Sequence, residues 1–299
     1  MISRRLLFSV MIPALVALST SSTSAATLKV VASFTVLADV VRQVGGDRVT
    51  VASLVGPNGD PHEFEPSPSD AKNLNAAQVA FVSGVGLEGW MDRLIAASGY
   101  KGKPVVVSEG IKLRTMDEDG QTVTDPHVWN SPVNVKVWVA NIEEALAKAA
   151  PADAAAFKTN AEAYLKHLDA LDAYAHSKLD PIAADHRKVL TSHDAFGYFG
   201  REYGVQFLAP IGVSTESEAS AADVAKLIEQ IKAEHVKTYF FENSNDPRLV
   251  RQIAKATGAE PGGELYVESL SDARGAAPTY EKMFRYNVDQ LAAAMAKAS

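Results

Sequence analysis

The chain contains an internal repeat, in which four blocks of the first half recur in the same order in the second half. Three pairs of blocks have an offset of 159 residues: 29–35 with 188–194, 78–83 with 237–242, and 92–99 with 251–258. The fourth pair, which lies second in chain order, matches 65–70 with 218–223 at an offset of 153. One such match could arise by chance. Four matches in the same order indicate two halves with the same topology.

Strand and helix patterns alternate within the repeated unit. Residues 28–34 (LKVVASF) form the apolar, β-branched run of a buried strand. Residues 35–46 (TVLADVVRQVGG) predict a helix that ends at two glycines, and residues 48–55 (RVTVASLV) predict the next strand. A strand–helix–strand alternation is typical of parallel α/β structure.

One long helix is predicted between the two halves. Apolar side chains recur every three or four positions between Pro151 and Pro181: Phe157, Ala161, Tyr164, Leu168, Leu171, Ala175 and Leu179. A helix of this extent is roughly 40 Å long. Its length and central position favour a rigid linker between two domains over an ordinary packed helix.

The predicted fold class is therefore α/β, with two similar lobes that each contain a mainly parallel β-sheet flanked by helices. We expect an N-terminal lobe at residues 26–150, a linking helix at residues 151–181 and a C-terminal lobe at residues 182–299. Open α/β sheets bind ligands beyond the carboxyl ends of their strands. A ligand site is therefore expected in a cleft between the lobes.

The first 25 residues have the pattern of a cleavable secretory signal peptide. Arg4 and Arg5 precede an apolar run from Leu6 to Leu18, and small residues lead to a cleavage site after Ala25. The apolar run is about 13 residues long, which is too short to span a bilayer comfortably. Export through this signal predicts a periplasmic protein.

The chain contains no cysteine and has a formal net charge of −7. A cysteine would be needed for lipidation, for a disulfide or for a thiolate metal ligand, so we expect a soluble, non-lipidated protein held together by its cores. Loss of the two signal-peptide arginines changes the net charge from −7 to −9. An acidic protein has no electrostatic reason to bind nucleic acid or an anionic membrane.

Three of the seven histidines lie in loops or at helix starts, and at least two of them follow strands. They are His62 in GDPHEFEP, His127 in TDPHVWNSP and His193 in VLTSHDAF, with Asp125 predicted to cap the helix at His127. Each alone could be a hydrogen-bonded loop residue, but together they favour a metal site, because neutral imidazole is the commonest nitrogen ligand. The remaining four are interpreted as solvated or capping residues: His167, His176, His186 and His235.

A tetrahedral site with three imidazoles needs a fourth ligand. Glu268 in GELYVESLSD follows a short apolar run and aligns with Glu109 at the offset of 159. It is the candidate carboxylate, and Asp272, four residues later, is the rival ligand. Glu63, beside His62, is interpreted as a solvated or supporting residue.

Five segments together resemble the zinc- and manganese-binding solute receptors of ABC importers, the cluster often called A-I. They occur in the order of that family: GDPHEFEPSPSD (59–70), DPHVWNSP (125–132), SHDAFGYF (192–199), FFENSNDPRLVRQIAKATGA (240–259) and LYVESLSD (265–272). The resemblance covers essentially the whole mature chain, and it implies two α/β lobes joined by a rigid helix. By resemblance, the first lobe supplies two metal ligands and the second lobe two more: His62, His127, His193 and Glu268.

Two departures from the family pattern bear on the metal. The family usually has aspartate where this chain has Glu268, and zinc-specific members often carry a long His-rich loop where this chain has residues 114–127 (RTMDEDGQTVTDPH). Manganese receptors of the family often have a carboxylate at the position of His193, so this histidine favours Zn2+. Mn2+, or a mixed Zn2+/Mn2+ preference, is the alternative, because three histidines and one carboxylate also accept manganese.

The resemblance implies a periplasmic, high-affinity zinc receptor that is not an enzyme. Its expected partner is the permease of an ABC importer in the inner membrane, with a periplasmic metallochaperone as a second candidate, and the protein is expected to be a monomer. A zinc-dependent hydrolase with Glu268 or Glu63 as general base is a remote alternative, although the sequence contains no HExxH motif. A receptor for another small solute would need a larger cleft lined with aromatic or hydrogen-bonding groups. The large aromatic residues available are instead interpreted as packing residues: Trp90, Trp129 and Trp138.

Overall fold

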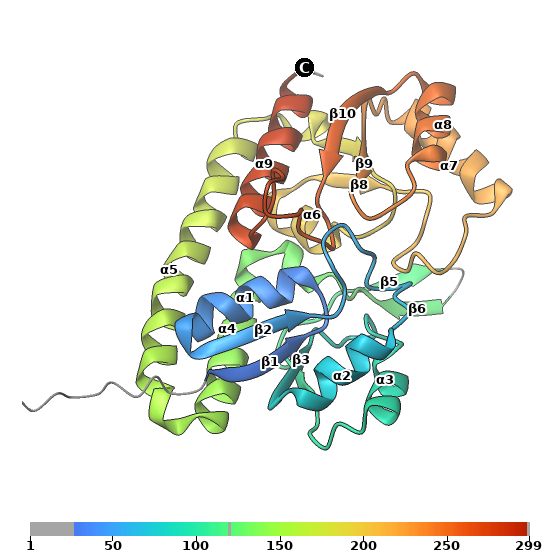
Figure 1. Cartoon of the computed structure of the whole chain (residues 1–299). Helices are drawn as coiled ribbons and strands as arrows, with labels where there is room; N and C mark the ends of the chain where they lie inside the picture. Colours follow the sequence, from blue (N-terminus) through green and yellow to red (C-terminus); the bar gives the residue numbers. More distant parts are fainter. Residues whose placement is uncertain (1–26, 119–120, 298–299) are drawn as a thin grey trace, which may run out of the picture.

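The structure is a computed structural model that describes residues 27–118 and 121–297. The predicted signal peptide at residues 1–25 lies outside the described residues. Two separate parallel sheets, each of four strands, form the centres of two lobes (Figure 1). None of the helices in the described part of the chain is long and apolar enough to cross a bilayer.

The first sheet has the strand order β2-β1-β3-β4, and the second has the equivalent order β8-β7-β9-β10. The first sheet comprises β1 (Leu28–Ala32), β2 (Val49–Ser53), β3 (Val79–Val82) and β4 (Val105–Val106). The second comprises β7 (Lys188–Leu190), β8 (Gln206–Leu208), β9 (Thr238–Glu242) and β10 (Glu260–Leu265). In both sheets the chain enters at an inner strand, adds an edge strand on one side and then crosses to the other side. The two halves therefore share one topology, as the repeat predicted.

Helices connect the strands and pack against the sheets and one another (Figure 1). The first half contains α1 (Thr35–Gly45), α2 (Pro68–Ala76), α3 (Met91–Ser98) and α4 (Pro132–Ala149). The second half contains α6 (Gly197–Tyr203), α7 (Ala221–Ala233), α8 (Arg248–Thr257) and α9 (Tyr280–Lys297). Smaller elements are the antiparallel hairpin β5 (Thr115–Glu118) and β6 (Gln121–Thr124), and the 3-10 helices η1 (Gly46–Arg48), η2 (Val128–Asn130), η3 (Pro151–Asp153) and η4 (Ala184–His186).

One aligned block of the repeat corresponds to the same helix cap in both lobes. The Ser67 side chain accepts a hydrogen bond from the backbone N–H of Asp70 at the start of α2. Ser220 accepts the equivalent bond from Asp223 at the start of α7. A serine at this position satisfies a backbone donor that the first turn of a helix leaves free. The sequence match at an offset of 153 therefore reflects a shared signal for helix initiation.

Helix α5 (Ala154–Leu179) runs along both lobes (Figure 1). All seven apolar residues that predicted this helix are buried. It packs against α1 and α4 from the first lobe and against α9 from the end of the chain. The long helix is confirmed, while the exact division into residues 26–150, 151–181 and 182–299 stays a prediction.

The main hydrophobic core is continuous through both lobes. It joins Phe34 and Trp129 of the first lobe to Phe199 and Tyr280 of the second. The Tyr280 hydroxyl also donates a hydrogen bond to the backbone carbonyl of Trp129 at 2.8 Å. Shared apolar packing of this kind restricts the relative motion of two lobes beyond what a linking helix alone would do.

Candidate metal centre

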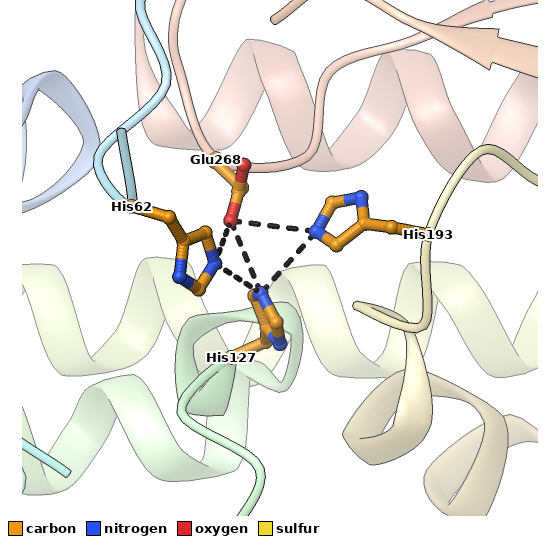
Figure 2. A group of neighbouring side chains, drawn as sticks. All are labelled: His62, His127, His193 and Glu268. Carbon is orange, nitrogen blue, oxygen red and sulfur yellow. Dashed lines mark hydrogen bonds and ion pairs between the residues drawn. The ribbon is translucent and has the colours of Figure 1, made fainter. Parts of the chain in front are cut away.

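The four residues predicted as ligands lie together where the two lobes meet (Figure 2). His62 and His193 lie in the loops after β2 and β7, His127 immediately precedes η2, and Glu268 follows β10. One ligand atom from each residue lies within 4.8 Å of those from the other three. The exposed fraction is 7% for His62 and 0% for the others, so water is largely excluded from the site.

Oε1 of Glu268 is the common contact of the three imidazoles. It lies 2.8 Å from Nε2 of His62, 3.1 Å from Nε2 of His127 and 3.4 Å from Nε2 of His193. Nε2 of His127 lies 3.2 Å from Nε2 of His62 and 3.4 Å from Nε2 of His193. Three nitrogens and one oxygen therefore face one point, which is the ligand set of a tetrahedral N/O metal site.

Asp125 orients His127. Its Oδ1 lies 2.9 Å from Nδ1 of His127 and also accepts the backbone N–H of His127 at 2.9 Å. The prediction that Asp125 caps a helix is wrong, because its carboxylate binds His127 itself, which precedes the 3-10 helix η2. A carboxylate that accepts the Nδ1 proton leaves the Nε2 lone pair directed into the site. In the sequence, the only indication of this role is that Asp125 lies two residues before His127.

Glu242 orients His193 in the same way, although it is not among the residues predicted from the sequence. Its Oε2 lies 2.5 Å from Nδ1 of His193, and its Oε1 accepts the backbone N–H groups of Ser192 and His193. Glu242 ends β9, which pairs directly with β7, the strand that leads to His193. No local motif links the two residues, because only the pairing of the strands brings them together.

Opposite charges of the imidazoles and carboxylates stabilise one another in the site. Burial opposes protonation of His193, but the carboxylates of Glu242 and Glu268 hold its pKa well above the ordinary value. Burial also opposes ionisation of Glu268, but His193 and His62 hold its pKa well below the ordinary value. These interactions favour the protonated form of His193, and a metal ion that binds its Nε2 would have to displace a proton.

One oxygen of the site has no protein partner. Oε2 of Glu268 is buried and makes no hydrogen bond with any described residue. Leaving a buried acceptor unpaired costs about 1–3 kcal/mol. A cation held between the carboxylate and the imidazoles would supply the missing interaction. The donor set, its burial and this oxygen all fit a divalent metal ion.

Two tryptophans hold the loops that carry ligands. Nε1 of Trp90 donates to the carbonyl oxygen of Pro61, next to His62, at 2.8 Å. Nε1 of Trp129 donates to the carbonyl oxygen of Val267, next to Glu268, at 2.7 Å. Both rings are buried in the core, as predicted, but their N–H groups also fix the backbone beside the site.

The remaining candidates lie outside the site. Asp272 and Glu63 are exposed, so neither competes with Glu268 as a buried ligand.

A second, half-buried group of side chains that could hold a metal consists of Asp172, His176 and Glu202. Tyr203 donates to Asp172 at 2.9 Å, and Nδ1 of His176 lies 3.2 Å from Asp180. Asp172 and His176 are thus already paired with neighbouring side chains, so we assign no metal to this second group.

Comparisons with known proteins show the family to which this chain belongs. The profile of the family described as "ZnuA: Zinc-uptake complex component A periplasmic" matches residues 30–294. The manganese-binding lipoprotein MntA of Bacillus subtilis (strain 168) is 34% identical over 277 residues, which cover 90% of this chain and 90% of MntA. The iron-binding protein YfeA of Yersinia pestis is 32% identical over 273 residues, which cover 91% of this chain and 87% of YfeA.

Solved structures show the same fold. The periplasmic zinc binding protein TroA from Treponema pallidum matches with a TM-score of 0.85 and 32% identity, over 90% of this chain and 99% of TroA. A manganese-bound periplasmic metal binding protein from Candidatus Liberibacter asiaticus matches with a TM-score of 0.81 and 26% identity, over 90% of this chain and all of that protein. These relatives are named for different metals, so they support divalent metal binding in general. The chain belongs to the ZnuA family, the extracytoplasmic metal-binding receptors that serve the permeases of ABC importers and are not enzymes.

Proposed function

We propose that this protein is a periplasmic, high-affinity zinc receptor that delivers the ion to the permease of an ABC importer. The observation that carries the proposal is the convergence of three imidazole Nε2 atoms on Oε1 of Glu268 in a buried site. Zn2+ accepts three nitrogens and one oxygen in a closed tetrahedron, whereas Mn2+ prefers more oxygen ligands and a higher coordination number. The ligand set therefore favours zinc.

A manganese or mixed zinc/manganese receptor is the second candidate, and one observation favours it. If the unpartnered Oε2 of Glu268 also binds the ion, the site gains a fifth ligand and a second oxygen, which suits Mn2+ better. Zinc binds more tightly than manganese to almost any such donor set, so zinc binding in a test tube cannot decide between them. The metal must be identified in protein taken from the cell.

The ion acts as cargo that links the lobes. His62 and His127 come from the first half of the chain and His193 and Glu268 from the second, so a bound ion holds the halves together. His62 is the only one of the four residues with any exposed surface, at 7%. Transfer to the permease would require this ligand set to separate.

The cellular context is part of the proposal. We expect a soluble monomer, with a periplasmic metallochaperone as a second candidate partner beside the permease. The relative MntA is named as a lipoprotein, so mass spectrometry of the mature protein should decide whether a lipid is attached. The mass of the mature protein should equal that of an unmodified chain cleaved after Ala25.

The decisive experiment is metal analysis of protein purified from its own periplasm, in parallel with His193→Ala and the control variant His167→Ala. His193 is fully buried in the site, whereas His167 lies on α5 with 62% of its side chain exposed. Wild type and the control should carry about one zinc per chain, and His193→Ala should carry little. Wild-type protein without zinc would refute the zinc assignment, and a fully loaded His193→Ala variant would refute the assignment of the site.

A further inference from the structure

The Tyr198 hydroxyl of the second lobe is bound to two backbone groups of the first lobe. The side chain is fully buried, near the start of α6. The hydroxyl accepts a hydrogen bond from the N–H of Arg114 at 2.9 Å and donates one to the carbonyl oxygen of Asp125 at 3.2 Å. One hydroxyl thus satisfies a donor and an acceptor from the opposite lobe.

Arg114 and Asp125 close the base of the β5–β6 hairpin. The N–H of Asp125 donates to the carbonyl oxygen of Arg114 at 3.0 Å, and Nη1 of Arg114 donates to Oδ2 of Asp125 at 2.8 Å. The other carboxylate oxygen, Oδ1, holds the ring and backbone of His127. A shift of this base would therefore shift the orientation of His127.

Gly197 allows α6 to approach the hairpin base. A methyl group at this position would overlap the Arg114 guanidinium and would lie 2.6 Å from Oδ2 of Asp125. The same short stretch of the second lobe carries His193 in the metal centre and, five residues later, Tyr198 at the hairpin base. The two lobes are therefore joined beside the metal centre by a contact that contains no metal.

We propose that Tyr198 is a positioning residue for metal retention, which holds the Asp125–His127 pair of the first lobe against the second lobe. The inference rests on the proposed function, because it concerns the same metal centre. Loss of the hydroxyl leaves the backbone N–H of Arg114 without its partner and frees the hairpin base to move. His127 then leaves the ion more readily, and the dissociation rate rises while the ligands themselves are intact.

The test compares Tyr198→Phe with Tyr203→Phe in the full mature chain. Tyr203 lies on the same helix and is equally buried, but its hydroxyl donates to Asp172 on α5, away from the metal centre. Zn2+ dissociation is measured after loaded protein is mixed with excess chelator. Tyr198→Phe should release zinc about tenfold faster, the scale of effect seen when a group that orients a ligand is lost, and Tyr203→Phe should match wild type. Equal rates for all three proteins would overturn the inference.

A spectroscopic reading separates positioning from general destabilisation. The visible ligand-field spectrum of bound Co2+ reports the geometry of its ligands, so Tyr198→Phe should change it and Tyr203→Phe should not. A Tyr198→Phe spectrum identical to wild type, with faster release only in proportion to lost thermal stability, would indicate a structural role and overturn the inference. Wild-type protein that binds neither Zn2+ nor Co2+ would overturn both the proposed function and this inference.

A wild-type measurement covers the case in which Tyr198→Phe does not fold. Coupling between the hairpin base and the ion must be reciprocal, so metal loading should slow hydrogen exchange at the backbone N–H of Arg114. The backbone N–H of Asn160 on α5, far from the hairpin in sequence, serves as the reference. Exchange at Arg114 that is the same with and without bound zinc would overturn the proposed coupling.

Discussion

Nε2 of His62 lies 2.8 Å from Oε1 of Glu268, so an imidazole of the first lobe meets a carboxylate of the second inside a buried site. The pKa of His193 is raised and that of Glu268 is lowered, because the protonated imidazole and the carboxylate stabilise each other. In the proposed metal-bound form, the same atoms would be the ligands and a divalent ion would replace the protons. Metal affinity and protein stability are therefore both linked to pH, in opposite directions.

Metal affinity should fall as the pH is lowered from about 8 to about 6, because protons compete for the imidazoles. The pKa of His193 is held well above its usual 6.5 by Glu242 and Glu268, which outweigh burial, and that of His127 is also raised. Each displaced proton contributes up to about a tenfold change in affinity per pH unit. Chelator competition at constant ionic strength measures the effect. An affinity that stays constant over this range would contradict the ligand assignment.

The stability of the metal-free protein should fall as the pH rises above about 6.5. A raised pKa means that protonated His193 stabilises the fold fully below its unfolded pKa and that this contribution is lost as pH rises through the folded pKa. The lowered pKa of Glu268 contributes stability above 4.5, which is lost only as pH falls through its folded pKa. Urea unfolding should therefore show metal-free protein weakening towards alkaline pH, and saturating zinc should remove this loss. Constant stability of the metal-free protein would argue against protonated imidazoles in the site.

Replacement of Glu242 by glutamine should lower zinc affinity by about 10- to 100-fold, the usual effect of losing a carboxylate that orients a metal-bound histidine. Glu242 uses one oxygen for the two backbone N–H groups and the other for Nδ1 of His193. Glutamine has only one acceptor oxygen, so it cannot make both sets of contacts. Glu234→Gln is the matched control, because Glu234 pairs with Lys188 at 3.2 Å and is not in contact with the site. Calorimetric titration of both variants checks the prediction. Equal affinities would show that Glu242 does not support His193 as a ligand.

Replacement of Gly197 by alanine should destabilise the protein by about 1–3 kcal/mol, as overpacking of a close contact does. The added methyl group would overlap Arg114 and push α6 away from the hairpin base. Gly89→Ala is the control, because a methyl group there meets no atom within 4 Å. Urea unfolding of both variants measures the difference. The idea of a close approach at Gly197 fails if the two variants are equally stable.

Local sequence signals determined much of the fold. The periodic apolar residues of α5 are all buried, because a helix turns its side chains to one face every three or four residues. The paired serines Ser67 and Ser220 cap α2 and α7 through bonds to residues only three positions away. The equivalent strand orders of the two sheets then follow from a repeated order of elements. Each of these signals acts over a few residues, so each can be found in one sequence.

The four candidate ligands could also be predicted from the sequence, because their motifs surround them locally and parallel strands place such loops at a common edge. Asp125 lies two residues from His127, yet the predicted helix cap is wrong and its carboxylate contacts the His127 imidazole. Whether a side chain binds a helix end or an imidazole depends on the backbone path, which the neighbouring residues do not specify.

The two similar α/β halves, the long helix between them and the four metal-ligand candidates could thus be predicted from residue patterns alone. Only the tertiary structure placed Glu242 on His193, left Oε2 of Glu268 unpartnered and set the Tyr198 hydroxyl between Arg114 and Asp125. These contacts join residues that are far apart in the chain. Their partners are selected by strand pairing and by the packing of one lobe against the other, where shifts of an ångström decide which polar groups meet.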